Sequence, residues 1–277
     1  MCNLGSLNFS RIQDFDELID TINAAAMFLT LGGARAEMPY PHAKEVRDAY
    51  PKIGLGIMGM HEWLIQRGYD YEVVPELKEW LGAYASLTDL YAGWTADKFG
   101  IPKPERTRAI APAGTISLLA GTTSGIEPVY ATAMKRRYLV DGTHWKAEYF
   151  VDPTVDYLVK EYDIDPDKIQ TAYQLAKTPE TRIKFQAEVQ KYVDMGISST
   201  INLPAWGSEY NNEDTLVSFS SLLLKYAPQL RGITTYPDGA RAGQPLTEVS
   251  YKEAIEKTGI VFDDFSEKQC KSGVCGI

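Results

Sequence analysis

The chain has 277 residues, a net charge of −9, 44% hydrophobic residues and three cysteines. This length allows one large domain or two small ones, and the negative charge argues against a general nucleic-acid surface. No apolar run approaches the ~20 residues that span a bilayer, and the N-terminus lacks the basic region and apolar core of a secretory signal. Three cysteines are too few for a disulfide framework. We therefore expect a cytoplasmic protein that binds no membrane.

Two long helices are predicted in the first part of the chain. Apolar residues at helical spacing follow Asp14, which with Glu17 resembles a capping box, and the pair Gly32–Gly33 is expected to end this helix. The second helix is predicted over residues 75–99, with Gly100 as its C-terminal cap.

The second part alternates strands with helices. Strands are predicted at 107–112, 198–204 and 230–237, and helices at 178–196 and 212–228. This alternation favours an α/β fold with a largely parallel sheet or barrel over residues 1–237. From residue 238 the pattern ends, so we expect residues 238–277 to form a flexible tail, with at most one short helix near 250–257.

The segment GLGIMG places Gly54, Gly56 and Gly59 at the spacing of a dinucleotide-binding fingerprint. The context differs, because the preceding residues are mostly charged and interrupted by Pro51. In addition, no acidic ribose-binding residue ends a second strand about 20 positions later. We therefore interpret these glycines as allowing close packing at the start of a helix.

The segment APAGTISLLAGTTSGIEP (111–128) opens directly after a predicted strand. A strand, a Gly-containing turn and an apolar stretch are what a phosphate-binding turn requires. Residues 113–117 would present consecutive backbone N–H groups, and Thr115 and Ser117 add hydroxyl donors. No Gly-Lys-Ser/Thr follows, so this is not a Walker loop. The sequence leaves two interpretations open, an anion-binding turn and an ordinary capped helix.

The cysteines lie only at the two ends of the chain, at Cys2, Cys270 and Cys275. The last two enclose four residues rather than the two of a zinc knuckle, and no second Cys or His pair lies near them. We therefore expect no metal site. We interpret the pair as a dithiol for thiol–disulfide exchange, with two inert exposed cysteines as the alternative.

Other chemistry-bearing residues show weaker patterns. The three histidines (His42, His61 and His144) form no His-x-x-x-His pair, and we expect them to be structural. Arg136 and Arg137 are interpreted either as an anion-facing pair or as a solvated basic turn.

Six segments, in this order, resemble the large, catalytic chain of ribonucleotide reductase. They are CNLGSLN (2–8), IGLGIMG (53–59), IAPAGTISLLAGTTSGIEP (110–128), SSTINLP (198–204), GITTYPDGARAGQPL (232–246) and CKSGVC (270–275). The resemblance covers essentially the whole chain, and residues 110–128 are its most specific part. It implies the second half of a ten-stranded α/β barrel built from two five-stranded halves, followed by a redox tail.

The resemblance assigns roles residue by residue. Cys2 matches one of the two cysteines that reduce the ribose and end each turnover as a disulfide. Cys270 and Cys275 match the tail dithiol that reduces this disulfide and is then reduced by a thioredoxin or glutaredoxin. The turn that binds the substrate phosphates is matched by Ala113, Gly114, Thr115, Ile116 and Ser117.

Other parts of the family pattern are absent from this sequence. The radical cysteine, in an Asn-x-Cys-x-Glu pattern upstream of CNLGS, is missing, as are the partner of Cys2, the first half-barrel and the effector-binding segments. The resemblance therefore implies the C-terminal part of a split ribonucleotide reductase, inactive alone, whose partner chain carries the N-terminal half. A Met before Cys2 favours a gene split over an intein origin.

This enzyme would reduce ribonucleoside di- or triphosphates to 2′-deoxyribonucleotides by thiyl-radical chemistry, and we expect the assembled enzyme to form homo-oligomers. Two alternatives stay open, a non-catalytic assembly module and an unrelated redox protein that uses only the tail dithiol. The intact Cys2, Cys270 and Cys275 argue against the assembly module.

The segment GTISLLAGTTSGIEP most resembles the adenosylcobalamin-dependent, class II enzymes, so adenosylcobalamin is the expected cofactor. Class I enzymes receive the radical from a metal-containing subunit through two adjacent tyrosines, where this chain has only Tyr236 in TTYPDG. A class I alpha chain with Tyr236 in radical transfer is the alternative, since some small viral enzymes mix class features. The expected location therefore includes the host cytoplasm of a virus-encoded enzyme. No glycyl-radical segment supports class III.

Overall fold

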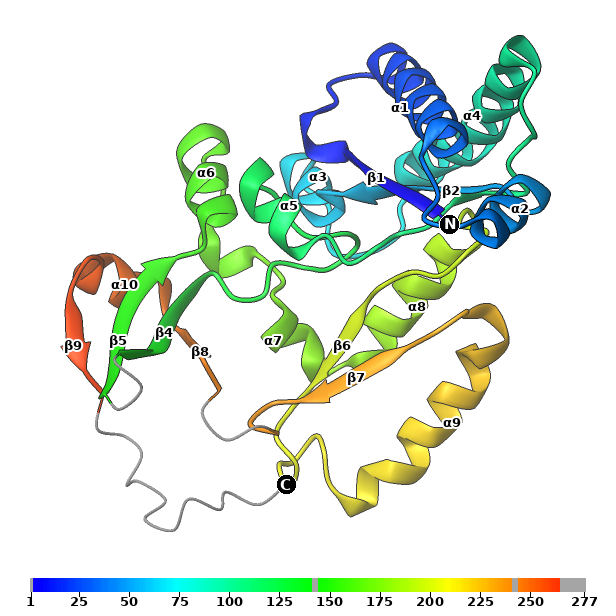
Figure 1. Cartoon of the computed structure of the whole chain (residues 1–277). Coiled ribbons are helices and arrows are strands. Elements are labelled where there is room, and N and C mark those ends of the chain that lie inside the picture. The colour runs from blue at the N-terminus through cyan, green and yellow to red at the C-terminus, as the bar shows by residue number, and fades with distance from the viewer. Residues whose placement is uncertain (1, 141–143, 241–243, 265–277) are drawn as a thin grey trace. The chain divides into compact units, whose positions relative to one another are not determined.

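The computed structural model describes residues 2–140, 144–240 and 244–264, and the chain divides into two compact units (Figure 1). The first unit contains residues 2–128, 179–201 and 217–234. The second contains residues 129–178 and 202–216 and the described residues from 235 onwards. The mixed composition of helices and strands confirms the predicted α/β fold class.

Parallel strands form the centre of the first unit. Strand β1 (Cys2–Asn8) pairs with β2 (Lys52–Met58), and β2 pairs with β3 (Arg106–Arg108). After β3, Ile110 forms a parallel bridge with Ile197. The chain then continues into β6 (Thr200–Leu203), which pairs with β7 (Thr234–Pro237). Both of these strands begin in the first unit and end in the second. This succession of five paired segments is what a half-barrel requires.

Two long helices, α1 (Phe15–Arg35) and α4 (Pro75–Phe99), pack against each other in this unit (Figure 1). The Asp14 cap is confirmed, because its carboxylate accepts a hydrogen bond from the Glu17 backbone N–H at 2.9 Å, and Gly100 ends α4 at φ 61° as predicted. The capping box is not completed, because the Glu17 carboxylate accepts from the Gln13 backbone N–H instead of that of Asp14. The apolar stripe of α1 is buried, as its spacing predicted, through Leu18, Ile22, Ala26 and Leu29.

The prediction that Gly32 and Gly33 end α1 is wrong, since the helix continues to Arg35. The two glycines allow α1 to pass close to β1. The Asn3 amide nitrogen lies 3.2 Å from the position of a Cβ on Gly32 and donates a hydrogen bond to the Leu29 carbonyl at 3.4 Å. A side chain on Gly32 would therefore press on Asn3.

The remaining helices of the first unit are shorter. They are α2 (Pro41–Ala49), α3 (Met60–Gln66), α5 (Gly114–Ala120), α8 (Pro179–Gln190) and α9 (Leu216–Tyr226), which begins at the unit boundary. In the described parts of the chain, no helix combines the length and the hydrophobicity that crossing a membrane requires.

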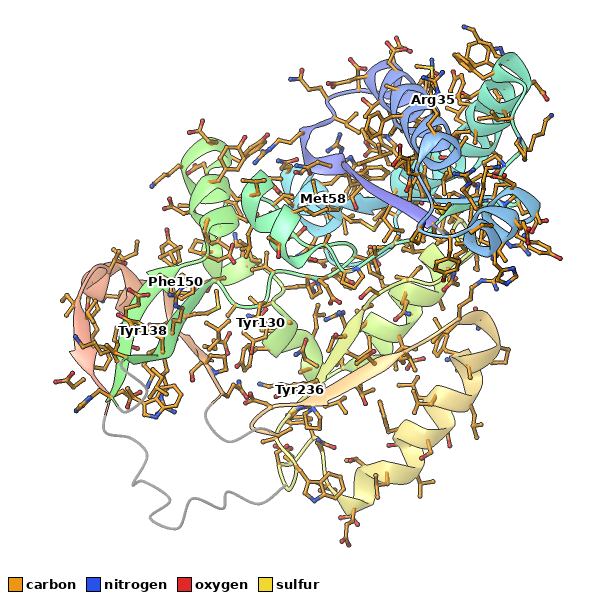
Figure 2. All side chains as sticks on the ribbon, in the orientation of Figure 1. Arg35, Met58, Tyr130, Tyr138, Phe150 and Tyr236 are labelled. Atoms are coloured by element: carbon orange, nitrogen blue, oxygen red, sulfur yellow. The ribbon has the colours of Figure 1, made fainter. Side chains whose placement is uncertain are left out.

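The segment GLGIMG is mostly strand, which corrects the prediction of a helix start. Gly54 and Gly56 lie within β2, whose labelled end residue Met58 appears in Figure 2, and only Gly59 caps a helix, α3. A Cβ on Gly56 would lie 2.5 Å from the Ala109 carbonyl oxygen. The glycine therefore allows the chain that follows β3 to cross β2 at close range. This arrangement agrees with the interpretation that the segment GLGIMG is not a dinucleotide-binding loop.

An antiparallel sheet that the sequence did not predict organises the second unit. Its order is β8–β4–β5–β9, formed by Leu246–Val249, Ala133–Val140, His144–Val151 and Val261–Asp263. Figure 2 labels Tyr138 on β4 and Phe150 on β5. Helix α10 (Tyr251–Lys257) packs on β5, and α6 (Pro153–Tyr162) and α7 (Ala172–Ala176) complete the unit.

This sheet corrects the expectation of a flexible tail from residue 238, because β8, α10 and β9 are part of the folded unit. The side chain of Asp264, just after β9, is buried and pairs with Arg137 at 2.8 Å, with Lys135 at 3.8 Å. Arg137 is therefore neither solvated nor facing a free anion, the two roles considered for it. Residues 265–277, with Cys270 and Cys275, lie outside the described residues.

A pair of Gly→Ala variants tests the close crossing at Gly56. Gly56→Ala should lower the free energy of unfolding by about 2 kcal/mol, because the backbone oxygen of Ala109 cannot rotate away. Gly93→Ala is the matched control, since Gly93 lies inside α4 with open space around it. This control should raise stability by roughly 0.5–1 kcal/mol. Urea unfolding followed by circular dichroism measures both, and equal stability of Gly56→Ala and the parent chain would refute the crossing.

Candidate active site

Cys2 begins β1, and its free thiol is half-buried against β2. The Sγ atom and the Cβ of Ala109 each lie 3.2 Å from the position of a Cβ on Gly54. The thiol and Ala109 therefore share one face of the sheet, above the bare backbone of Gly54. Burial raises the pKa of the Cys2 thiol, and Asp194 adds to the increase while Lys52 opposes it. The thiol therefore keeps its proton at neutral pH.

The predicted phosphate turn forms the start of α5. The first N–H groups of a helix have no acceptor within it, so those of Gly114, Thr115 and Ile116 are available to a ligand. No other atoms crowd the position of a Cβ on Gly114, and the side chains of Thr115 and Ile116 are exposed. Ser117 differs from the prediction, because its buried hydroxyl donates a hydrogen bond to the Gly114 carbonyl at 3.0 Å.

The sheet connects the thiol to this turn. Ala109, beside Cys2, is four residues before Ala113, and four extended residues span at most ~14 Å. Cys2 and the start of α5 therefore lie within roughly 20 Å of each other along this connection. The structure brings these two predicted elements into one unit.

A buried polar network holds the chain that leaves α5. The carboxylate of Glu62, fully buried on α3, accepts a hydrogen bond from the Thr122 hydroxyl and pairs with Arg11 at 3.2 Å. The Gly59 backbone N–H donates to the Thr123 carbonyl at 2.7 Å. Gly59 has φ 74°, a conformation that favours glycine. The network fixes the C-terminal end of α5 to the start of α3.

A second anchor holds the end of the 110–128 segment. The Glu127 carboxylate pairs with the Arg182 guanidinium, whose side chain is 1% exposed, and accepts a hydrogen bond from the Thr200 backbone N–H at 2.7 Å. Arg182 also donates to the Thr200 carbonyl at 3.0 Å. One ion pair thus joins this segment to α8 and β6. Sequence reasoning missed it, although Glu127 is the only charged residue between 111 and 128.

His61 is buried beside this ion pair, which fits the structural role expected for it. Its ring meets Tyr71 edge to face at 5.2 Å between centroids. Burial lowers the pKa of His61 to about 3, and the nearby Arg182 guanidinium contributes in the same direction. The imidazole is therefore neutral in the folded protein at physiological pH.

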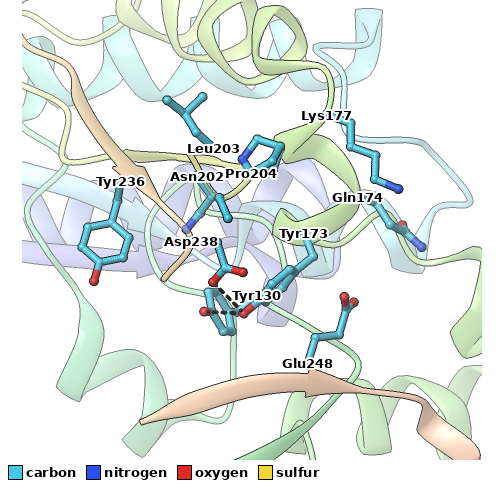
Figure 3. Close-up of a pocket in the computed structure, with 12 residues that line it drawn as sticks. Tyr130, Tyr173, Gln174, Lys177, Asn202, Leu203, Pro204, Tyr236, Asp238 and Glu248 are labelled. Atoms are coloured by element: carbon cyan, nitrogen blue, oxygen red, sulfur yellow. Dashed lines mark hydrogen bonds between the residues drawn. The ribbon is translucent and has the colours of Figure 1, made fainter. Parts of the chain in front are cut away.

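The second unit contains a cavity of about 210 Å³ (Figure 3). The hydroxyls of Tyr130 and Tyr173 lie 3.1 Å apart, and the Tyr173 hydroxyl lies 3.5 Å from the Asp238 carboxylate. Tyr236, the candidate for radical transfer in the class I alternative, also lines this cavity. Sequence reasoning identified Tyr236 alone, because its neighbours come from segments far apart in the chain.

The predicted dithiol is not part of the described site, because Cys270 and Cys275 lie outside the described residues. No three His, Cys, Asp or Glu side chains are grouped as metal ligands within residues 2–140, 144–240 and 244–264.

Parallel strands that carry a protonated thiol, followed by a helix start with free N–H groups, fit one part of an α/β barrel. The chain matches the family model for the barrel domain of ribonucleotide reductase over residues 1–92 and 98–236. It therefore belongs to the ribonucleotide reductase family, as its motifs predicted.

Curated relatives share this region. The chain is 29% identical to a vitamin B12-dependent ribonucleoside-diphosphate reductase of Mycobacterium tuberculosis, over 94% of this chain and 42% of that protein. It is 27% identical to the vitamin B12-dependent ribonucleoside-diphosphate reductase of Thermoplasma acidophilum, over 99% of this chain and 42% of that protein. The chain thus spans less than half the length of these relatives.

Solved structures agree on the fold. A B12-dependent, class II ribonucleotide reductase superposes with a TM-score of 0.73 and 14% identity, over 92% of this chain and 39% of that one. The class Id alpha subunit of Actinobacillus ureae superposes with a TM-score of 0.63 and 19% identity, over 86% of this chain and 50% of that one. Both classes share the fold, so the fold alone does not separate them.

The buried neutral His61 predicts a pH dependence of stability. Its pKa is about 3 in the folded chain and near 6.5 when unfolded, so the unfolded state binds more protons between these values. His61 therefore contributes stability that is complete above pH 6.5 and falls by up to about 1.4 kcal/mol per pH unit as the pH drops toward 3.

The measurement is urea unfolding of the parent chain and of His61→Gln at pH 7 and pH 5. Carboxylates titrate equally in both proteins, so the difference between the two pH slopes reports His61. The parent should lose more stability than His61→Gln over this interval, and identical slopes would show that His61 is not buried as a neutral ring.

Proposed function

We propose that this chain supplies the C-terminal part of the catalytic chain of a ribonucleotide reductase that uses adenosylcobalamin. It acts together with the half-barrel that carries the radical cysteine, and the complete enzyme reduces ribonucleoside di- or triphosphates to 2′-deoxyribonucleotides. The observation that carries the proposal is the protonated Cys2 thiol on the same sheet face as Ala109, from which the chain leads into the α5 turn.

Cys2 acts as one of two reducing thiols. In the net reaction the C2′–OH of the ribose becomes C2′–H, the hydroxyl leaves as water, and two thiols are oxidised to one disulfide. Cys2 supplies one of these thiols, and the other belongs to the complementary half-barrel. The raised pKa of Cys2 suits this role because the reaction consumes thiol protons together with electrons.

The α5 turn binds the substrate phosphates. The N–H groups of residues 114–116 carry the partial positive charge of a helix start, which attracts phosphate in a protein of any net charge. The Thr115 hydroxyl adds one donor. The anchors at Glu62 and Glu127 both hold the chain that follows α5, which limits the movement of the turn before substrate binds.

The names of the mycobacterial and archaeal relatives support adenosylcobalamin as cofactor. Two cavities in the described residues have volumes of about 210 Å³ and about 30 Å³. Sites for drug-sized ligands start at roughly 300 Å³, and a corrin is larger than such ligands. Neither cavity is large enough to enclose the cofactor, so its site in this proposal is completed in the assembled enzyme.

A second candidate function is a class I alpha chain that receives its radical from a metal-containing subunit. The specific observation is Tyr236, which lies at the end of β7 and lines the cavity of the second unit. In this case turnover would depend on that subunit rather than on cobalamin.

Cysteine variants test the redox assignment in the presence of the complementary half-barrel. Cys2→Ser should abolish turnover with either thioredoxin or dithiothreitol as reductant, because the ribose loses one of its two thiols. Cys270→Ser should abolish turnover with thioredoxin but keep it with dithiothreitol, because dithiothreitol is small enough to reduce the active-site disulfide directly. Deoxyribonucleotide formation measures both, and full thioredoxin-dependent turnover of either variant would exclude its assigned role.

The two hydroxyls of the turn should differ in importance. Thr115→Val should raise the KM for the ribonucleotide about tenfold, the value of one hydrogen bond to a charged group. Ser117→Ala should change KM less, because its hydroxyl already donates to Gly114. Steady-state kinetics compares them, with Thr21→Val on α1 as a remote control, and a larger KM effect from Ser117→Ala would contradict the described geometry.

A further inference from the structure

The cavity of the second unit is not used by the reductive chemistry assigned to this chain. All residues that line it belong to that unit, and they come from five separate stretches of the chain (Figure 3). Its volume of about 210 Å³ is below the roughly 300 Å³ at which sites for drug-sized ligands begin. The cavity therefore suits a small ligand or one end of a larger one.

Three tyrosines, Tyr130, Tyr173 and Tyr236, form the aromatic part of the lining. The rings of Tyr130 and Tyr173 pack edge to face at 5.1 Å between centroids. Burial raises the pKa of both phenols, so the two rings are uncharged at neutral pH. Electron-rich rings in this state attract cations through their faces and offer hydroxyl oxygens as acceptors.

The charged part of the lining is negative. It contains the carboxylates of Asp238 and Glu248 and one cation, Lys177. Asp238 is held in place, since Gln244 donates a hydrogen bond to it at 2.8 Å. The Glu248 carboxylate makes no hydrogen bond or ion pair with any residue in the described parts of the chain (Figure 3). Burial raises the pKa of this carboxyl, and the Lys177 ammonium opposes the increase. Together these groups leave one uncompensated negative charge.

Uncharged amide and apolar groups complete the lining, with Asn202 and Gln174 as the amides and Leu203 and Pro204 as apolar contacts. The negative balance disfavours phosphorylated ligands, because a phosphate would meet two carboxylates and a single ammonium. The same balance combined with aromatic rings is typical of sites that recognise alkylammonium groups.

We propose that this cavity binds a small organic cation, an alkylammonium group on a short carbon skeleton. The aromatic rings contact the methylene or methyl groups, and Asp238 and Glu248 neutralise the charge. The lining residues of this cavity all belong to the second unit, and the phosphate turn belongs to the first. The proposed binding of a cation therefore does not depend on the reductase function proposed above.

The test compares two ligands of nearly equal shape. Choline carries the cation, and 3,3-dimethylbutan-1-ol replaces its nitrogen by carbon and is neutral. Titration of the full 277-residue chain, followed by NMR of the tyrosine ring protons, should give saturable binding of choline. The neutral alcohol should bind at least about fivefold more weakly, the effect of one partly exposed charge pair.

Charge variants should then change the affinity for choline in opposite directions at two positions, with a third position as control. Glu248→Gln should weaken choline binding about fivefold, and Lys177→Met should strengthen it by a similar factor, because the first removes an attractive charge and the second a repulsive one. Glu161→Gln, on α6 outside the cavity, is the matched control and should leave the affinity unchanged. Circular dichroism confirms that each variant is folded.

Three outcomes would overturn the proposal. The first is equal affinity for choline and its neutral analogue, and the second is a Lys177→Met variant that binds choline more weakly. The third is saturable binding of adenosine that choline does not displace, which would mark the cavity as a site for a neutral nucleoside.

Discussion

The ion pair between Glu127 and Arg182 is the constraint on which the proposed active site depends. It is largely removed from water, and the same carboxylate also accepts the Thr200 backbone N–H. Removing one partner of such a pair leaves an unpaired buried charge, at a cost of about 3–5 kcal/mol. Because the pair joins the segment after α5 to α8 and β6, three parts of the first unit hold their positions together. The same guanidinium helps to keep His61 neutral.

The sheet face that carries Cys2 depends on two glycines, which have no side chain, as much as on contacts between side chains. Gly54 leaves room for the thiol and for Ala109, and Gly56 lets the Ala109 carbonyl cross at close range. Larger residues would separate β2 from the chain after β3 and would move the α5 turn away from the thiol. The position of the α5 turn relative to the Cys2 thiol is therefore set by the two glycines together with the two anchors. The thiol supplies the chemistry.

Local signals in the sequence predicted the parts of this structure that depend on neighbouring residues. The Asp14 cap, the Gly100 cap and the motif that identifies the family are all short-range patterns. Sheet pairing was not predictable in the same way, because β8 and β9 have four and three residues and pair with strands more than 100 positions earlier. Their folding also shortens the stretch before Cys270. This stretch begins after Asp264 rather than at residue 238, where the sequence pattern placed its start.

We propose that this chain supplies the reducing half of a cobalamin-dependent ribonucleotide reductase. The most direct measurement is deoxyribonucleotide formation in a complete mixture of this chain, the half-barrel with the radical cysteine, adenosylcobalamin, a thioredoxin system and a ribonucleotide. Product should form in the complete mixture, and none should form when this chain or the cobalamin is omitted. Product that forms without this chain, or only with a metal-containing radical subunit in place of cobalamin, would contradict it.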